Sequence, residues 1–175
     1  MRFVRERFGD DGCREVVAEL PPEDQAILTA GVLPHEWVRF ALWVRLMTAI
    51  DHRFGKGDLA MCREMGRFSA RVNLPTLYRI FYQLGSTRYI MRRAARLWDV
   101  HYDSGRLVVD EGGPGLVTLR IEGFDTPHRA HCLSVLGWGE QSVEMSGGAN
   151  PVGDELACRT QGALVCELRL RWEER

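Results

Sequence analysis

The hydrophobic pattern of this chain changes its period near residue 100, and this change constrains the fold more than any other feature. Before that point, apolar residues recur every three to four positions, which is the spacing of amphipathic helices. Prolines and glycines divide this part of the chain into segments. We therefore predict helices over residues 10–20, 23–30, 35–54, 58–69, 76–84 and 87–98.

Short β-prone runs replace the helical pattern after residue 100. The runs RLVVD (106–110) and LVTLRIE (116–122) flank EGGPG, a sequence with the turn chemistry of a hairpin. A helix from about Pro127 to Met145 follows, and two further strands close the chain. The last strand, CELRLRW, alternates apolar and charged side chains. Helices first and antiparallel strands afterwards predict an α+β fold, with N-terminal helices packed on a C-terminal antiparallel sheet.

Length and composition favour one globular domain. The chain has 175 residues, of which 45% are hydrophobic and 27% charged, an ordinary balance for a single core. We predict a single domain of residues 1–175, with a helical part (1–99) and a strand-rich part (100–175). The predicted helix at 35–54 is apolar around most of its circumference, so it should be central or should meet a second copy of the chain. The second of these outcomes would make the chain a homodimer through its helical part.

Charge and motif content disfavour several function classes. The formal net charge of -1 gives no global attraction to nucleic acid. No apolar run is long enough to span a bilayer, and the N-terminus MRFVRERFGDDG becomes charged at once, as in a cytoplasmic protein. We find no nucleophile elbow, no glycine-rich phosphate loop and no HExxH motif. We therefore expect a cytoplasmic protein that is not an enzyme and binds neither nucleic acid nor a membrane.

Four residues of the strand-rich part suggest a metal site: Cys132, Glu155, Cys158 and Cys166, spaced Cys-x22-Glu-x2-Cys-x7-Cys. The loop RTQGALV returns the chain as a hairpin, which should bring Cys158 and Cys166 together. Three thiolates and a carboxylate suit Zn²⁺, which is tetrahedral and accepts sulfur and oxygen donors. Four protein ligands would close the site, so this zinc should be structural. The alternative is that the cysteines are small buried hydrophobic residues and Glu155 is a solvated loop carboxylate.

Three segments between Trp98 and Trp172 resemble the vinyl-4-reductase (V4R) domain, a small-molecule-binding module related to the Bet3-type subunits of the TRAPP tethering complex. They are WDVHYDSGRLVV, GFDTPHRAHCLSVLGWGE and ELACRTQGALVCELRLRW. V4R sensor domains of phenol-responsive activators hold zinc with a Cys, a Glu and two further Cys, and the spacing here matches that arrangement. The resemblance implies dimerisation through the N-terminal helices and an apolar or aromatic ligand bound near the metal.

The same resemblance implies a role in signalling, with a protein partner downstream. The activators couple the V4R domain to an ATPase and a DNA-binding domain, neither of which this sequence contains, so what the sensing controls is open. A scaffold of TRAPP-like fold that binds other proteins and no small molecule is an alternative.

Tyr102, Ser104 and Arg106 spell YxSxR, which gives a weaker resemblance to the haem-based nitric-oxide sensors called H-NOX domains. In that family the motif binds the haem propionates, a task that suits an arginine fork with hydroxyl donors beside it. The family also needs a proximal histidine on an upstream helix. Only His35 and His52 precede the motif at any distance, and neither is where the family would place it. We favour a turn that starts a strand with Arg106 exposed, and keep a haem-binding gas sensor as the alternative.

An apolar ligand needs a lined pocket, and aromatic side chains are candidates for lining it. The candidate ligand-binding residues are Trp37, Trp43, Tyr78, Phe81, Tyr82, Trp98, Tyr102 and His131. Aromatic residues at helical spacing are more often plain core, so a solid core is the alternative. His131 also lies next to Cys132 and could replace Glu155 as a metal ligand. Adjacent residues on a helix point apart, however, so a supporting position for His131 is favoured.

Overall fold

The computed structural model describes residues 1–33, 36–84 and 87–174, without the side chains of 74–84, 88 and 94. These residues form two compact units, Met1–Cys62 and Arg63–Arg175. The boundary between the units lies well before residue 100. The change from helices to strands therefore occurs inside the second unit. None of the described helices is both long enough and apolar enough to cross a membrane.

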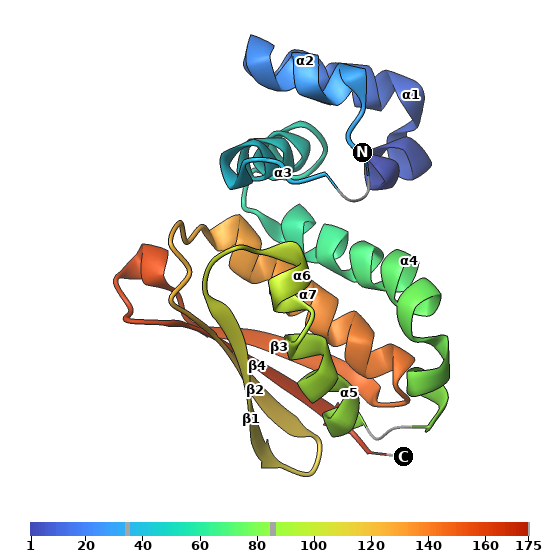
Figure 1. Cartoon of the computed structure of the whole chain (residues 1–175), viewed down its shortest axis with the longest axis vertical. Coiled ribbons are helices and arrows are strands. Elements are labelled where there is room, and N and C mark those ends of the chain that lie inside the picture. The colour runs from blue at the N-terminus through green and yellow to red at the C-terminus, as the bar shows by residue number, and fades with distance from the viewer. Residues whose placement is uncertain (34–35, 85–86, 175) are drawn as a thin grey trace. The chain divides into compact units, whose positions relative to one another are not determined.

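The first unit consists of helices (Figure 1). They are α1 (Arg2–Ala18), α2 (Pro22–Ala30), α3 (Phe40–Phe54) and the first residues of α4 (Ala60–Leu84). Proline at the first position of α2 suits a helix start, because that position has no intrahelical N–H partner. The core of the unit is apolar and nearly inaccessible to solvent at Val4, Val16, Leu42 and Ile50.

Two helix boundaries in the first unit differ from the prediction. Helix α1 begins at Arg2, but Gly9 within it is non-helical, with φ 71° and ψ -172°. The stretch after this kink starts near residue 10, as predicted, whereas the stretch before it was not predicted because its charged residues show only a weak apolar pattern. Helix α3 begins at Phe40 rather than at residue 35, and Trp37 lies before it with 62% of its surface exposed. The apolar pattern continues through Trp37, so the period alone did not locate the helix start. Pro34 and His35 are outside the described residues.

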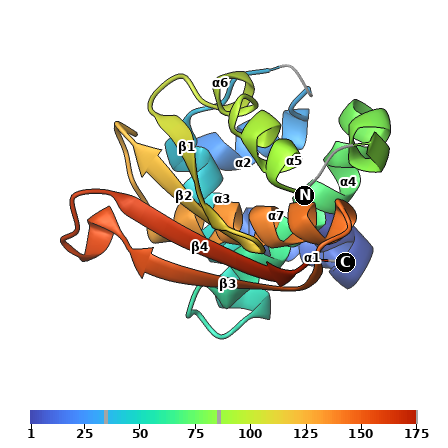
Figure 2. The same ribbon diagram turned by 90° about the horizontal axis from the view of Figure 1, so that it is seen from below.

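The second unit packs helices on a four-stranded antiparallel sheet of order β1-β2-β4-β3 (Figures 1 and 2). After α4 its helices are α5 (Thr87–Ala95), α6 (Trp98–His101) and α7 (Arg129–Met145). Its strands are β1 (Arg106–Gly113), β2 (Leu116–Glu122), β3 (Ala149–Ala157) and β4 (Cys166–Glu173). The α+β prediction, with helices first and an antiparallel sheet afterwards, is confirmed.

Helix α4 joins two segments that we predicted as separate helices. It continues from Ala60 to Leu84 and passes through Pro75. A proline inside a helix removes one hydrogen bond to the carbonyl four residues earlier. That residue is Arg71, which is exposed, so water can satisfy its carbonyl.

Helix α7 lies between α4 and the sheet, and two glycines allow the close approach. A Cβ on Gly137 would come within 1.9 Å of the carbonyl oxygen of Arg63 in α4. On the other side, a Cβ on Gly139 would come within 2.7 Å of Leu170 in β4. The sheet face below α7 is apolar and buried at Val117, Leu119, Ile121, Leu168 and Leu170.

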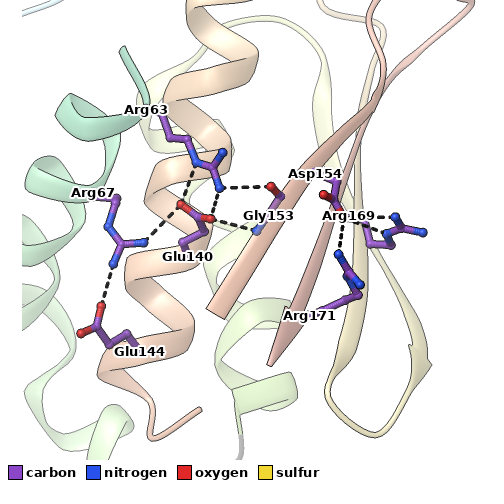
Figure 3. A network of polar contacts seen from close by, with 8 residues as sticks. All are labelled: Arg63, Arg67, Glu140, Glu144, Gly153, Asp154, Arg169 and Arg171. Carbon is purple, nitrogen blue, oxygen red and sulfur yellow. Dashed lines mark hydrogen bonds and ion pairs between the residues drawn. The ribbon is translucent and has the colours of Figure 1, made fainter. Parts of the chain in front are cut away.

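A buried carboxylate on α7 ties this layer together (Figure 3). Glu140, with a side chain only 3% exposed, accepts hydrogen bonds from Arg63 and Arg67 of α4. Its Oε1 also accepts the backbone N–H of Gly153 at 2.8 Å, and the Gly153 carbonyl accepts from Arg63 at 3.0 Å. Since β3 is an edge strand, these two side chains satisfy the backbone groups that a further strand would otherwise pair.

Candidate metal centre

Three cysteines of the second unit meet in its interior. The Sγ atoms of Cys132, Cys158 and Cys166 all lie within 4.8 Å of one another, and the three residues are buried and form no disulfide. Cys132 comes from the first turn of α7, Cys158 follows β3, and Cys166 opens β4. Segments that are far apart in the sequence therefore bring three sulfur donors to one point, within reach of a single metal ion.

A β-bulge directs two of the predicted ligands to the same side of the sheet. Glu155 pairs with Leu168, but Ala157 pairs with Glu167, so Leu156 is an extra residue in β3. Side chains alternate between the faces of a strand, and one extra residue reverses the alternation that follows. Cys158 therefore shares with Glu155 the face that packs against α7, instead of pointing to the opposite face.

Glu155 lies on the same face of the sheet as Cys158 and Cys166 and is held by an arginine. Its Oε2 accepts a hydrogen bond of 2.8 Å from Nε of Arg129, the first residue of α7. The Glu155 side chain is only 11% exposed, so it is not a solvated loop carboxylate. Its Oε1 is buried and has no hydrogen-bond partner in the part of the chain that the structure describes. Among the described residues, the group of converging ligand atoms consists of the three sulfurs and does not include Glu155.

The loop between β3 and β4 forms hydrogen bonds with two of the sulfurs. The backbone N–H of Arg159 points to Cys166 Sγ at 3.4 Å, and the Thr160 hydroxyl lies 3.0 Å from Cys158 Sγ. The turn ends at Gly162, whose φ of 93° favours glycine. Hydrogen bonds of this kind stabilise a thiolate that carries negative charge.

Without a cation, the surroundings of Cys132 favour its protonated thiol. Burial, followed by the hydrogen bond and the charge of Cys166, raises the pKa of the Cys132 thiol far above its ordinary value. A bound divalent cation reverses this preference, because it stabilises the deprotonated ligands. Three soft sulfur donors suit zinc, and the buried Oε1 of Glu155, which accepts no hydrogen bond from any described residue, is a group that a nearby cation would satisfy.

His131 does not belong to the thiol group, although it is adjacent to Cys132. Its ring packs against Trp98, Tyr102 and Phe124, with ring centroids 5.5, 4.8 and 4.9 Å away. Burial, and to a smaller extent His128, lowers the pKa of His131 to about 3, so the ring is neutral at pH 7. The structure thus brings together three of the eight candidate ligand-binding residues and adds Phe124, which we did not predict.

Each of the three YxSxR residues makes its own contact with neighbouring side chains, and the three do not converge on one point. Tyr102 belongs to the aromatic cluster just described, and burial raises the pKa of its phenol above the ordinary value of 10.0. The carbonyl of Ser104 accepts the indole N–H of Trp98 at 2.9 Å. Arg106 opens β1 with a side chain 74% exposed, and binds Glu122 of β2 at 2.6 Å. The motif is therefore a turn that starts a strand, as we favoured from the sequence.

The other predicted ligand-binding residues give no complete pocket. Trp43 is half-buried in α3 of the first unit and stacks on Phe40 with ring centroids 5.5 Å apart, while Trp37 is exposed. The side chains of Tyr78, Phe81 and Tyr82 lie outside the described residues. An apolar ligand site that includes these residues stays a prediction.

Sequence reasoning missed Arg129 and the bulge at Leu156. The arginine lies in the segment PHRAHC, where it looks like any solvated residue near a helix start. A buried carboxylate needs a cationic partner, so burial of Glu155 would have pointed to an arginine nearby. The sequence does not show that Glu155 is buried.

Comparisons with known proteins support one of the two family resemblances. No family model matches the chain, and no curated protein matches it. The chain is similar in structure to the H-NOX protein of S. oneidensis in the Fe(II)NO ligation state, with a TM-score of 0.73 and 12% identity over 99% of this chain and 94% of that one. The unliganded Fe(II) H-NOX protein of K. algicida gives a TM-score of 0.73 and 11% identity over 99% and 92%.

A third structure, from work on haem distortion in the H-NOX family, matches with a TM-score of 0.67 and 14% identity over 99% of this chain and 90% of that one. At these identities the likeness shows the fold, which is the H-NOX fold. The weaker of our two resemblances is thereby supported as far as the fold is concerned. The stronger one, to V4R and TRAPP subunits, receives no support.

Proposed function

We propose that this chain is a non-catalytic sensor domain of H-NOX fold with a zinc centre in its second unit. The observation that carries the sensor assignment is the structural match over 99% of the chain to proteins studied in Fe(II) and Fe(II)NO states. These matches favour our haem-sensor alternative over an apolar molecule as the ligand.

The zinc centre is supported by the geometry of this chain itself. Three buried sulfurs lie within 4.8 Å of one another, and the bulge in β3 brings Glu155 to the same face of the sheet. Cys132, Cys158 and Cys166 would hold the ion, with Glu155 as the fourth donor. A zinc ion bound in this way stabilises the fold, because unfolding would separate its ligands.

The zinc assignment is tested by elemental analysis of protein purified without a metal-affinity step. We expect about one zinc ion per chain. Zinc-free protein in which the thiols of Cys132, Cys158 and Cys166 react freely after mild denaturation would contradict the assignment. The fold would be unaffected by that result, because its evidence is independent of the metal.

Haem is the second candidate, and the comparisons are the reason to keep it. The residues that would bind its propionates do not fit that task as they are placed here. Arg106 is paired with Glu122, and Tyr102 is enclosed by Trp98, Phe124 and His131. Propionate binding by this motif would therefore require Arg106 to leave its carboxylate partner.

A hemin titration decides between these possibilities. If Arg106 binds haem, Glu122→Gln frees the arginine and should tighten hemin binding, whereas Arg106→Gln should weaken it. The readout is the Soret band and its stoichiometry. No Soret band in the wild-type protein and in both variants would rule out the haem sensor and leave the sensor with another ligand.

A further inference from the structure

One charged pair connects the start of α7 to the edge of the thiol cluster. Arg129 lies three residues before Cys132, and its Nε donates to Oε2 of Glu155 at 2.8 Å. Arg129 therefore links the first turn of α7, which carries Cys132, to Glu155 of β3, three residues before Cys158.

The two oxygens of Glu155 are used unequally. Arg129 occupies Oε2, whereas Oε1 is buried and accepts no hydrogen bond from any of the described residues. A buried carboxylate oxygen without a partner is costly, and native proteins rarely retain one unless something else binds there. The sulfurs already converge without Glu155, so what the centre lacks is a fourth donor.

We propose that Arg129 is the positioning residue that holds Glu155 as the oxygen donor of a zinc ion bound by Cys132, Cys158 and Cys166. The inference rests on the zinc centre proposed above and goes beyond it by naming the residue that orients the fourth ligand. Arg129 binds one oxygen of the carboxylate and leaves the other for the metal, as a supporting hydrogen bond does in other metal sites.

Charge supports the same role for Arg129. A divalent ion with three thiolates and one carboxylate carries a net charge of about -2. Such an anion is expensive inside a protein unless a cation lies beside it. Arg129 brings that cation, and because arginine remains protonated it does so at every pH at which the thiolates bind metal.

Cobalt(II) substitution tests the proposal, because its spectrum reports the donor atoms. Sulfur-to-cobalt charge transfer appears in the near ultraviolet, and the visible bands move to lower energy as sulfur replaces oxygen. We expect the wild-type protein to show three sulfur donors and one oxygen donor. Arg129→Gln should lower the zinc affinity by about 10- to 100-fold and alter the visible bands.

A double substitution separates positioning from a general charge effect. Glu155→Cys supplies a fourth thiolate that needs no arginine to present it, so it should add charge-transfer intensity. In this background, Arg129→Gln should cost much less affinity than it does in the wild-type chain. An equal cost in both backgrounds would overturn the proposal, because Arg129 would then not act through Glu155.

Arg92→Gln is the matched control, since it also breaks an Arg–Glu pair of the second unit, but Glu111 in that pair lies opposite Val117, at the other end of β2 from the residue that pairs with Cys166. It should leave the cobalt spectrum unchanged, and circular dichroism should show each variant folded. A normal cobalt spectrum in Arg129→Gln would also refute the positioning role while leaving the zinc centre intact. The absence of charge transfer in all proteins would instead refute the zinc centre itself.

Discussion

At the scale of single residues, burial decides which side chains matter. Cys132 and His131 are neighbours on α7, yet one meets two other sulfurs and the other packs among aromatic rings. The difference follows from the helix, in which adjacent side chains point about 100° apart. The sequence shows both residues, but their separate environments depend on which elements pack on each side of α7.

Removal of one thiol should abolish the metal centre. Cys132→Ser leaves two sulfurs, and the hydroxyl is a much weaker zinc ligand than a thiolate. We expect loss of bound zinc and a lower melting temperature of protein purified with zinc. Cys13→Ser is the control, because Cys13 is a buried cysteine of the first unit. Retention of full zinc occupancy by Cys132→Ser would show that the metal is bound elsewhere.

The buried Asp24 should make the stability of the first unit depend on pH. Its carboxylate accepts two hydrogen bonds from Arg45, at 2.5 and 2.9 Å, and these hold the pKa of Asp24 below its ordinary value of 3.8. A lowered carboxyl pKa stabilises the fold above pH 3.8, and this stabilisation is lost as the pH falls through the folded-state pKa.

Asp24→Asn should therefore destabilise the protein at pH 7 and have little effect at a pH below the folded-state pKa of Asp24. Urea unfolding of both proteins between pH 7 and pH 2.5 or so measures the difference. If the difference in free energy of unfolding between wild type and variant does not decrease as the pH is lowered, the Asp24–Arg45 ion pair is not the source of the stability.

At the scale of elements, the ion pairs of Glu140 and the close approaches at Gly137 and Gly153 fix how α4, α7 and β3 pack. Glu140 joins Arg63 of α4 to the backbone of Gly153 in β3, across a position where a Cβ would approach Glu140 to 3.0 Å (Figure 3). The helices and strands themselves were largely predictable from their periods. Their contacts were not, because a charged residue such as Glu140 reads as solvent-facing when only the sequence is known.

Glu140→Gln should destabilise the second unit strongly. It removes the negative charge from a side chain 3% exposed and leaves Arg63 and Arg67 without their shared partner. Breaking a buried ion pair in this way costs about 3 kcal/mol or more. Equilibrium urea unfolding measures the loss of free energy of unfolding.

Glu144→Gln is the matched control on the same helix. Glu144 binds Arg67 at 2.8 Å, but its side chain is 52% exposed, so the change should cost about 1 kcal/mol or less. Equal effects of the two substitutions would mean that Glu140 is not the anchor between α4, α7 and β3.

At the scale of the whole molecule, the chain has an H-NOX fold divided into two compact units. The change of hydrophobic period near residue 100 marks the beginning of the sheet and not the beginning of a unit. Homodimerisation through the helical part stays a prediction, as does a protein partner. The choice between the two family resemblances required the tertiary structure, because at 11–14% identity the sequence shares few residues with the H-NOX proteins.

The sequence by itself determined the order of helices and strands, the hairpin at residues 106–122 and the choice of the three cysteines. These features depend on local periodicity, turn chemistry and spacing, all of which are written along the chain. It could not supply the bulge at Leu156, the pairing of Arg129 with Glu155 or the bonding of Arg63 to Gly153. The paired residues in these bonds lie 26 and 90 positions apart, and only the packing of α4 and α7 on the sheet brings them together.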